Sequence, residues 1–162
     1  MPQQSTLTIH TIGHGRHSFE VFLGLLEEHN IKLVCDVRSV ARSRWAHFNG
    51  RPLALALGKN TIGYEHLPEC GGKVVVPPQE LERGLDRIVE LAADTLIALM
   101  CSESQPLTKH VRPQANCHRV GLLAPPLKRR GVRVQHILPD GSILEIDEEQ
   151  VPSIWSTNET KT

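Results

Sequence analysis

The side chains of this chain that are best suited to do chemistry lie in two short strings, Cys101-Ser102-Glu103 and Cys117-His118-Arg119. The first string follows the apolar run 95–100, and a strand end where polar residues take over is a common place for a site in an α/β domain. Together the strings supply two thiols, a carboxylate, an imidazole and a guanidinium. We therefore expect Cys117 or Cys101 to act as a nucleophile, with Glu103 or His118 as the proton carrier.

The expected surroundings of Cys117 favour this interpretation. Cys117 is expected at the start of a helix beside a histidine and an arginine, and such surroundings lower a thiol pKa and favour the thiolate. Two alternatives stay open: a cysteine after an apolar strand is usually buried and inert, and two thiols with a histidine can bind a metal ion. The phosphate loop of cysteine phosphatases and sulfurtransferases is excluded, because it requires arginine where the chain has Leu107. We assign no metal ligands, since the chain lacks a CxxC motif.

Residues at two earlier strand ends indicate an anionic ligand. Gly13 and His14 begin a loop between a strand and a helix, and backbone amides in such a loop can hold an anion; the alternative is a tight turn that needs glycine. Asp36 and Arg38 are two residues apart at a strand end, which predicts an ion pair on one face. That pair can also present the guanidinium to a phosphate or carboxylate. The predicted ligand-binding residues are therefore these four, Gly13, His14, Asp36 and Arg38, together with Arg119, which we expect to assist them.

A basic stretch with an aromatic residue, at Arg42, Arg44 and Trp45, suits nucleotides or single-stranded nucleic acid. A solvated loop is the common explanation of such a cluster. The segment 104–116 carries further basic residues, among them Lys109 and Arg112, and would extend the same surface. A non-catalytic nucleic-acid-binding module is therefore the second hypothesis for this chain.

The overall composition restricts the class of protein. The 162 residues suit one domain with a substantial core, and equal numbers of basic and acidic residues, 18 each, leave no net charge to attract nucleic acid or anionic membranes. No apolar run approaches the roughly 20 residues that span a bilayer. The first residues carry no secretory signal pattern, so we expect a cytoplasmic protein whose cysteines are reduced.

Alternating strand and helix patterns predict a single three-layer α/β domain over residues 1–151, with a mostly parallel sheet. An Asp-Gly turn at 140–141 predicts a C-terminal antiparallel hairpin. Residues 152–162 are expected to form a weakly ordered tail in which Trp155 is a candidate docking residue. The predicted strands are 6–12, 31–37, 62–67, 95–100, 132–138 and 143–146, and the predicted helices are 19–29, 52–58, 77–92 and one from 117 that kinks or restarts at Pro125.

Several short motifs follow one another in a fixed order: Thr11-Ile12-Gly13-His14, Asp36-Val37-Arg38 with Ser43, Tyr64–Leu67 with Gly71-Gly72, Met100–Glu103, Cys117-His118-Arg119, His136-Ile137 and Gly141. This order resembles the DUF488 family over residues 8–145. The resemblance implies a small α/β fold and the candidate site residues named above, whereas the biochemical role of that family is not established. The chain departs from the family pattern at Gly15, where serine is usual, at Ala41, where proline is usual, and in a longer segment between the two cysteines of the site.

The leading functional hypothesis is a small enzyme that acts on a nucleotide, a nucleic-acid base or another phosphorylated ligand. Its pocket would lie at the carboxyl ends of the parallel strands, where the predicted residues converge. The alternatives are the nucleic-acid-binding module and a thiol-based metal-binding or redox protein. Neither a cofactor nor an oligomeric state follows from the sequence.

Overall fold

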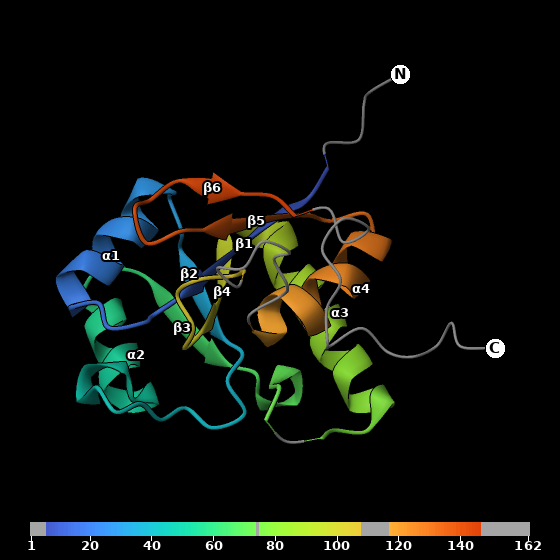
Figure 1. Ribbon diagram of the computed structural model, residues 1–162, viewed down its shortest axis with the longest axis horizontal. Coiled ribbons are helices and arrows are strands. Elements are labelled where there is room, and N and C mark those ends of the chain that lie inside the picture. The colour runs from blue at the N-terminus through green and yellow to red at the C-terminus, as the bar shows by residue number, and fades with distance from the viewer. Residues whose placement is uncertain (1–5, 74, 108–116, 147–162) are drawn as a thin grey trace.

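Six strands and the helices that join them form the framework of the protein (Figure 1), of which the computed structural model describes residues 6–73, 75–107 and 117–146. The strands are β1 (Thr8–Gly13), β2 (Leu33–Asp36), β3 (Gly63–His66), β4 (Ile97–Cys101), β5 (Arg133–Ile137) and β6 (Ile143–Leu144). The helices are α1 (Phe19–Glu28), α2 (Gly50–Gly58), α3 (Pro78–Asp94) and α4 (Ala124–Arg129), with short 3-10 turns η1 (Ala46–Phe48) and η2 (Pro68–Cys70) and a π-helical turn η3 (Arg119–Leu123).

The strands form one sheet in the order β3-β2-β4-β1-β5-β6. Strands β1 to β5 run parallel, and β6 pairs antiparallel with β5 through His136 opposite Leu144 and Ile137 opposite Ile143. Every residue of the central strand β4 is buried, as expected for a parallel strand covered on both faces. The prediction of a mostly parallel α/β sheet with a C-terminal antiparallel hairpin is therefore confirmed.

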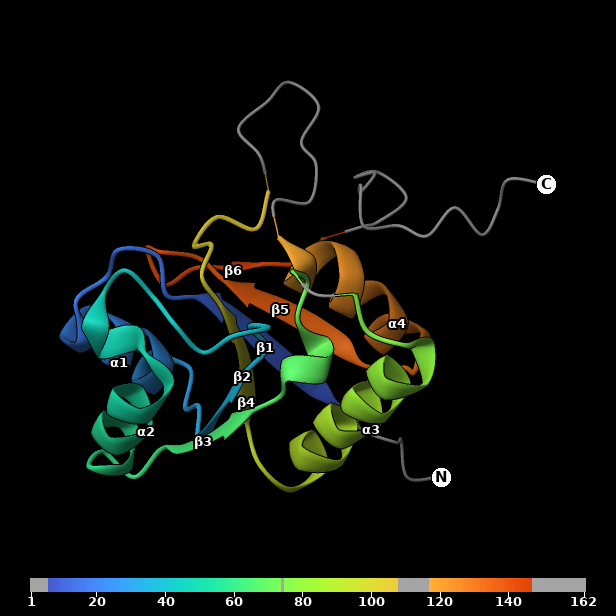
Figure 2. The ribbon, with the colours of Figure 1, turned by 90° about the horizontal axis from the view of Figure 1, so that it is seen from below.

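Two layers of helices cover the sheet, and each layer has its own part of the core. Helices α1 and α2 lie on one face and α3 and α4 on the other, which the two views of Figures 1 and 2 show from perpendicular directions. The first layer packs apolar residues such as Phe22, Leu26 and Leu57 against the sheet, and the second packs Leu85, Ile88 and Leu127. The predicted three-layer arrangement is present in the described part of the chain.

Local sequence signals explain two helix boundaries that matter for the site. Ser18 precedes α1, and its Oγ accepts a hydrogen bond from the backbone N–H of Val21 at 3.2 Å, so Ser18 caps the helix. Downstream, the helix that starts beside Cys117 runs as π-helix η3 and becomes the α-helix α4 at Ala124. Pro125 and Pro126 lie in the first turn of α4, where an N–H is not needed, so the helix restarts there as predicted.

The topology leaves a crevice at the carboxyl edge of the sheet. The chain leaves β1 and β2 toward the α1–α2 layer, and it leaves β3 and β4 toward the opposite layer. Because neighbouring connections diverge to opposite faces, a hollow opens beyond the strand ends. Within the described residues, no helix is both long and apolar enough to cross a membrane. The predicted tail with Trp155, and Lys109 and Arg112 of the predicted basic loop, lie outside the described residues.

Candidate functional site

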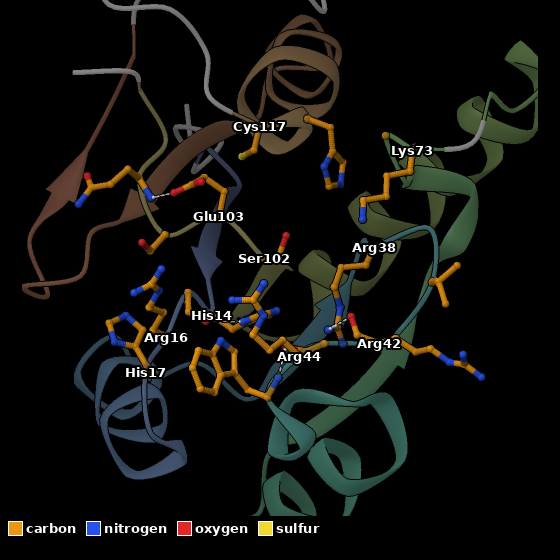
Figure 3. A pocket seen from close by; sticks show the side chains of 18 of the residues that line it. His14, Arg16, His17, Arg38, Arg42, Arg44, Lys73, Ser102, Glu103 and Cys117 are labelled. Carbon is orange, nitrogen blue, oxygen red and sulfur yellow. Dashed lines mark hydrogen bonds between the residues drawn. The ribbon is translucent and has the colours of Figure 1, made fainter. Parts of the chain in front are cut away.

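A cavity of about 1190 Å³ lies at the carboxyl edge of the parallel strands. The loops that follow all five parallel strands contribute to its wall, at positions 14–17 after β1, 38–45 after β2, 72–73 after β3 and η2, 102–105 after β4, and Pro139 after β5. Cys117 and His118, at the start of η3, complete the described wall. The cavity therefore occupies the crevice that the strand order creates, and Figure 3 shows its side chains.

The wall of the cavity is strongly basic. Four exposed cations, Arg16, Arg42, Arg44 and Lys73, project from three different loops, and the buried Arg38 adds a fifth. Among the described lining residues, Glu103 carries the only carboxylate. Cations that surround a hollow on several sides raise the local concentration of anions, so the wall suits a negatively charged ligand. The neutral net charge of the whole chain conceals this local excess.

Cys101 and Cys117 meet at one end of this cavity. Their sulfur atoms are 3.5 Å apart, and both residues are buried, with Cys117 7% exposed and Cys101 1% exposed. Cys117 lines the cavity, whereas Cys101 lies behind it at the end of β4. The Nε–H of Arg119 donates a hydrogen bond to the Cys117 sulfur at 3.2 Å. The two predicted strings thus form one cluster.

Arg119 is fully buried, yet no described carboxylate forms an ion pair with it. Besides Cys117, its guanidinium donates to the hydroxyl oxygen of Thr11 at 2.8 Å and to the backbone carbonyls of Glu103 at 3.1 Å and Ser104 at 3.2 Å. A buried guanidinium needs an anion nearby, because desolvation of an unpaired charge is costly. The Cys117 thiolate is the group in the described structure that supplies it.

The two thiols differ sharply in acidity. Burial opposes ionisation of Cys117, but a hydrogen bond from Cys101 and the charge and hydrogen bonds of Arg119 outweigh it and lower the Cys117 pKa to about 6. Burial, together with the hydrogen bond to Cys117, raises the pKa of Cys101. At neutral pH the pair is therefore a thiolate facing the cavity with a protonated thiol behind it.

A second cluster surrounds the carboxylate of Asp36 at the end of β2. Arg38 donates to both carboxylate oxygens, from Nε at 2.8 Å and from Nη2 at 2.7 Å, and Tyr64 on β3 donates its hydroxyl at 2.5 Å. Asp36 is fully buried, and Arg38 is 6% exposed. Burial works against the charged form of Arg38, but the hydrogen bonds and charge of Asp36 raise its pKa. The ion pair that the two-residue spacing predicts is present, and it fixes the guanidinium at the cavity wall.

Two histidines of the wall are held by hydrogen bonds to the backbone. His14 stacks on Phe48 and donates from Nδ1 to the carbonyl of Gly15 at 2.9 Å, which leaves its buried Nε2 without a partner in the described structure. Burial lowers the His14 pKa to about 4, so its Nε2 is a hydrogen-bond acceptor at neutral pH. His118 donates from Nε2 to the carbonyl of Val37 at 2.7 Å, and burial lowers its pKa.

The predicted site residues divide into two groups. Five of them line the cavity, namely His14, Arg38, Glu103, Cys117 and His118. Four do not line it and lie at or beside the strand ends: Gly13, Asp36, Cys101 and Arg119. These four contact the wall residues from behind, so the structure brings all nine predicted residues to one edge of the sheet.

Gly13 has a steric role at this edge. A Cβ atom built on Gly13 would lie 1.7 Å from the carbonyl oxygen of Glu103, so a side chain there would displace the loop after β4. The backbone N–H of His14 donates to the carbonyl of Cys101 at 2.9 Å, and that of Gly15 donates to Ser102 at 2.9 Å. The missing side chain lets the loops after β1 and β4 run side by side below the cavity.

Sequence reasoning did not assign Tyr64, Thr11, Arg16 or Lys73 to the site. Tyr64 reaches Asp36 from the neighbouring strand, and this contact depends on the β2–β3 register, which sets Val34 opposite Tyr64. Arg16 and Lys73 carry no spacing signal of their own. The paired glycines before Lys73 indicate a backbone that passes close to another segment, and a Cβ on Gly71 would lie 2.2 Å from the Ser39 hydroxyl oxygen.

The fold and this edge define an α/β protein with its candidate site at the carboxyl ends of parallel strands. The family model described as "Domain of unknown function DUF488" matches residues 18–75, the segment that holds α1, β2, α2, β3 and η2. This match confirms the resemblance to that family within residues 18–75, which are 58 of the 162 residues of the chain. No curated protein and no solved structure matches the chain.

Proposed function

We propose that this protein is an enzyme that binds a small phosphorylated ligand in the basic cavity and uses the Cys117 thiolate as its nucleophile. A nucleotide is the ligand class best suited to the wall. The observation that carries the proposal is the buried Cys117–Arg119 pair, which puts an anionic sulfur on the wall of a cavity rich in cations. The cost of burying Arg119 without a carboxylate is offset by the thiolate, so the fold itself maintains the nucleophile.

The cations of the wall would hold the ligand in two ways, one through a fixed guanidinium and the others through exposed side chains. Arg38 is held by Asp36 and by the carbonyl of Arg42, to which its Nη1 donates at 3.2 Å, so it offers an oriented guanidinium to a phosphate. Arg16, Arg44 and Lys73 are exposed and can close around the anion from different loops. Trp45, 37% exposed on the same wall, offers a ring face to a nucleobase.

Glu103 is the group that we assign as proton carrier. Its side chain lines the cavity, and its Oε1 accepts a hydrogen bond from the backbone N–H of Gln105 at 3.0 Å, which orients the carboxylate. His118 uses Nε2–H on Val37 and is neutral at pH 7, so it is less suited to donate a proton. The thiolate would attack an electrophilic atom of the ligand, and Glu103 would take a proton from water and pass it to the group that leaves.

The test is binding and turnover with matched pairs of phosphorylated and unphosphorylated nucleosides. We expect phosphorylated compounds to raise the melting temperature and their nucleosides to have no effect, because the wall binds anions. Arg44→Gln should weaken binding about tenfold, equivalent to roughly 1.4 kcal/mol. Arg51→Gln is the matched control, since Arg51 is exposed on α2 and does not line the cavity.

Cys117→Ser separates binding from chemistry. The variant should retain affinity for the phosphorylated ligand and lose turnover, because a serine hydroxyl is not ionised at neutral pH. The proposal is wrong if no phosphorylated compound binds the wild-type protein, or if Cys117→Ser turns the ligand over at the wild-type rate.

A second candidate function is binding of single-stranded nucleic acid, favoured by the rim of the cavity. Arg42, Arg44 and Trp45 are all exposed on the same loop, and a cationic groove with an aromatic ring suits stacked bases. Affinity for a single-stranded oligonucleotide should then fall steeply with added salt. Absence of binding at low salt removes this candidate and leaves the small-ligand proposal in place.

A further inference from the structure

The second thiol of the cluster does not react in the proposed phosphate chemistry, although its hydrogen bond helps to lower the Cys117 pKa. Cys101 does not line the cavity, yet its sulfur lies 3.5 Å from the Cys117 sulfur. The other cysteines, Cys35 and Cys70, are equally buried, and burial raises the pKa of each to about 12, so they are inert by comparison. The chain thus has one reactive cysteine, one close partner and two internal controls.

The separation of the two sulfurs is close to what a disulfide requires. A disulfide holds its sulfurs about 2.05 Å apart, so the pair must approach by roughly 1.5 Å. Cys101 is the last residue of β4 and Cys117 lies two residues before the first residue of η3, so the bond would join a strand end to a helix start. A change of this size is within reach of side-chain rotation.

The two thiols differ in their access to the cavity and in their ionisation, and this difference gives them different roles. Cys117 faces the cavity and is ionised, so it is the thiol that a dissolved oxidant reaches first. Cys101 is 1% exposed and protonated, and its nearest acceptors are the Cys117 sulfur and the Glu103 carbonyl at 3.6 Å. A group placed in this way meets an oxidised Cys117 before any external thiol can.

We propose that Cys117 and Cys101 form a redox pair in which Cys117 reduces a hydroperoxide in the cavity and Cys101 closes a disulfide with it. This proposal does not rest on the phosphorylated ligand.

The proposed reaction takes two steps. In the first step the thiolate attacks the terminal oxygen of the hydroperoxide, the O–O bond breaks, and the departing alkoxide takes a proton from water to give an alcohol; Cys117 becomes a sulfenic acid. In the second, the Cys101 sulfur attacks the Cys117 sulfur, the S–O bond breaks, and hydroxide leaves with the Cys101 proton as water. The two thiols lose two electrons in total, and the hydroperoxide gains them.

Closure of the disulfide changes the surroundings of Arg119. The sulfur of Cys117 loses its negative charge, so the buried guanidinium keeps only Thr11 and the carbonyls of Glu103 and Ser104 as partners in the described structure. Those carbonyls belong to the loop after β4, whose residues 102–105 line the cavity. Oxidation therefore removes the nucleophile and perturbs the wall that would hold the ligand, and reduction restores both.

The test exposes the reduced full-length protein to hydrogen peroxide and identifies the product by intact mass and peptide mapping. We expect loss of both thiols, a peptide linked through Cys101 and Cys117, and full recovery with dithiothreitol. The rate of thiol loss should reach half its maximum near pH 6, where Cys117 ionises. Cys101→Ser should stop at the sulfenic acid, which dimedone traps on Cys117.

Matched variants keep the outcome clear. A Cys35→Ser/Cys70→Ser double variant should form the same disulfide at the same rate, because these thiols lie outside the cluster. The proposal fails if folded wild-type protein gives no Cys101–Cys117 linkage, or if Cys101→Ser and wild type give the same product. Turnover of a phosphorylated ligand is measured separately and should persist in the Cys35→Ser/Cys70→Ser variant, which keeps both thiols of the cluster. Failure of the redox pair and failure of the phosphate chemistry are therefore distinguishable.

Discussion

Two arginines are buried at the same edge of the sheet, and they are neutralised in different ways. Arg38 faces the carboxylate of Asp36 through two side-chain hydrogen bonds, whereas Arg119 faces the sulfur of Cys117 together with uncharged oxygens. The first pair is a structural anchor, because the two hydrogen bonds from Arg38 hold both oxygens of the Asp36 carboxylate. In the second pair a hydrogen bond from Cys101 and the charge and hydrogen bonds of Arg119 lower the Cys117 pKa to about 6, so this pair depends on the ionisation of the thiol.

This difference bears on the nucleophile that we propose for this protein. An aspartate in place of Cys117 would neutralise Arg119 as well, but it would offer a weaker nucleophile and no redox chemistry. By burying a guanidinium beside a thiol, the fold couples its own stability to the ionised state of the sulfur.

The largest effect is expected from Asp36→Asn. The substitution leaves the Arg38 guanidinium buried without its anion, so we expect a loss of about 3–5 kcal/mol in the free energy of unfolding. Urea titration followed by circular dichroism measures it. Asp94→Asn is the control, because Asp94 is exposed at the end of α3, and it should change stability by less than about 0.5 kcal/mol. Equal losses in the two variants would mean that Asp36 has no special role as counterion.

The next effect concerns the pH dependence of stability at the thiol cluster. Cys117 has a pKa lowered to about 6 from an ordinary 9, so between these values the unfolded chain holds a proton that the folded chain lacks. Stability should therefore rise with pH, by on the order of 1 kcal/mol per pH unit, and this contribution is lost as pH falls toward 6. Urea titrations between pH 7 and 8.5 measure it.

Two comparisons isolate the thiol in that window. Cys117→Ser should flatten the rise, whereas Cys70→Ser should not, because the Cys70 pKa is raised to about 12 and the group stays protonated. Burial lowers the pKa of His14 to about 4 and of His136 to about 3, so these histidines add a loss of stability only below about pH 6.5. A rise that persists in Cys117→Ser would contradict the assignment of the thiolate as counterion.

The smallest effect is expected from Tyr64→Phe. The variant removes one hydrogen bond to the Asp36 carboxylate and leaves the Arg38 pair in place, so we expect a loss of about 1–2 kcal/mol. A double-mutant cycle is the proper control, since the chain has a single tyrosine. Tyr64→Phe should cost less in the Asp36→Asn background than in the wild type. Additive losses would show that the hydroxyl does not act through the carboxylate.

Local patterns predicted much of this arrangement. The abrupt end of the apolar run before Cys101 predicted a strand end, and β4 ends at that residue. The spacing of Asp36 and Arg38 predicted their ion pair, because side chains two apart on a strand share a face. The prolines at 125 and 126 predicted a helix restart, which occurs at α4. Each of these predictions depends on residues that are neighbours in sequence.

Contacts between distant segments were not predictable in the same way. Arg119 and Thr11 are 108 positions apart, and their hydrogen bond exists because β1 lies beside β4 in the sheet. Tyr64 reaches Asp36 only because β3 pairs with β2 in one particular register. The amino-acid composition also does not reveal the basic cavity, because its cations come from three loops and the net charge of the chain is zero.

The sequence by itself determined the α/β class, the strand ends and the residue types that meet there, because periodicity, glycine and proline act over a few residues. The anionic partner of each buried arginine, and the thiol that faces the cavity, are set by the tertiary structure alone. The reason is physical: burial and the distance between charges set the ionisation of a thiol, and both depend on how strands far apart in the chain are brought together.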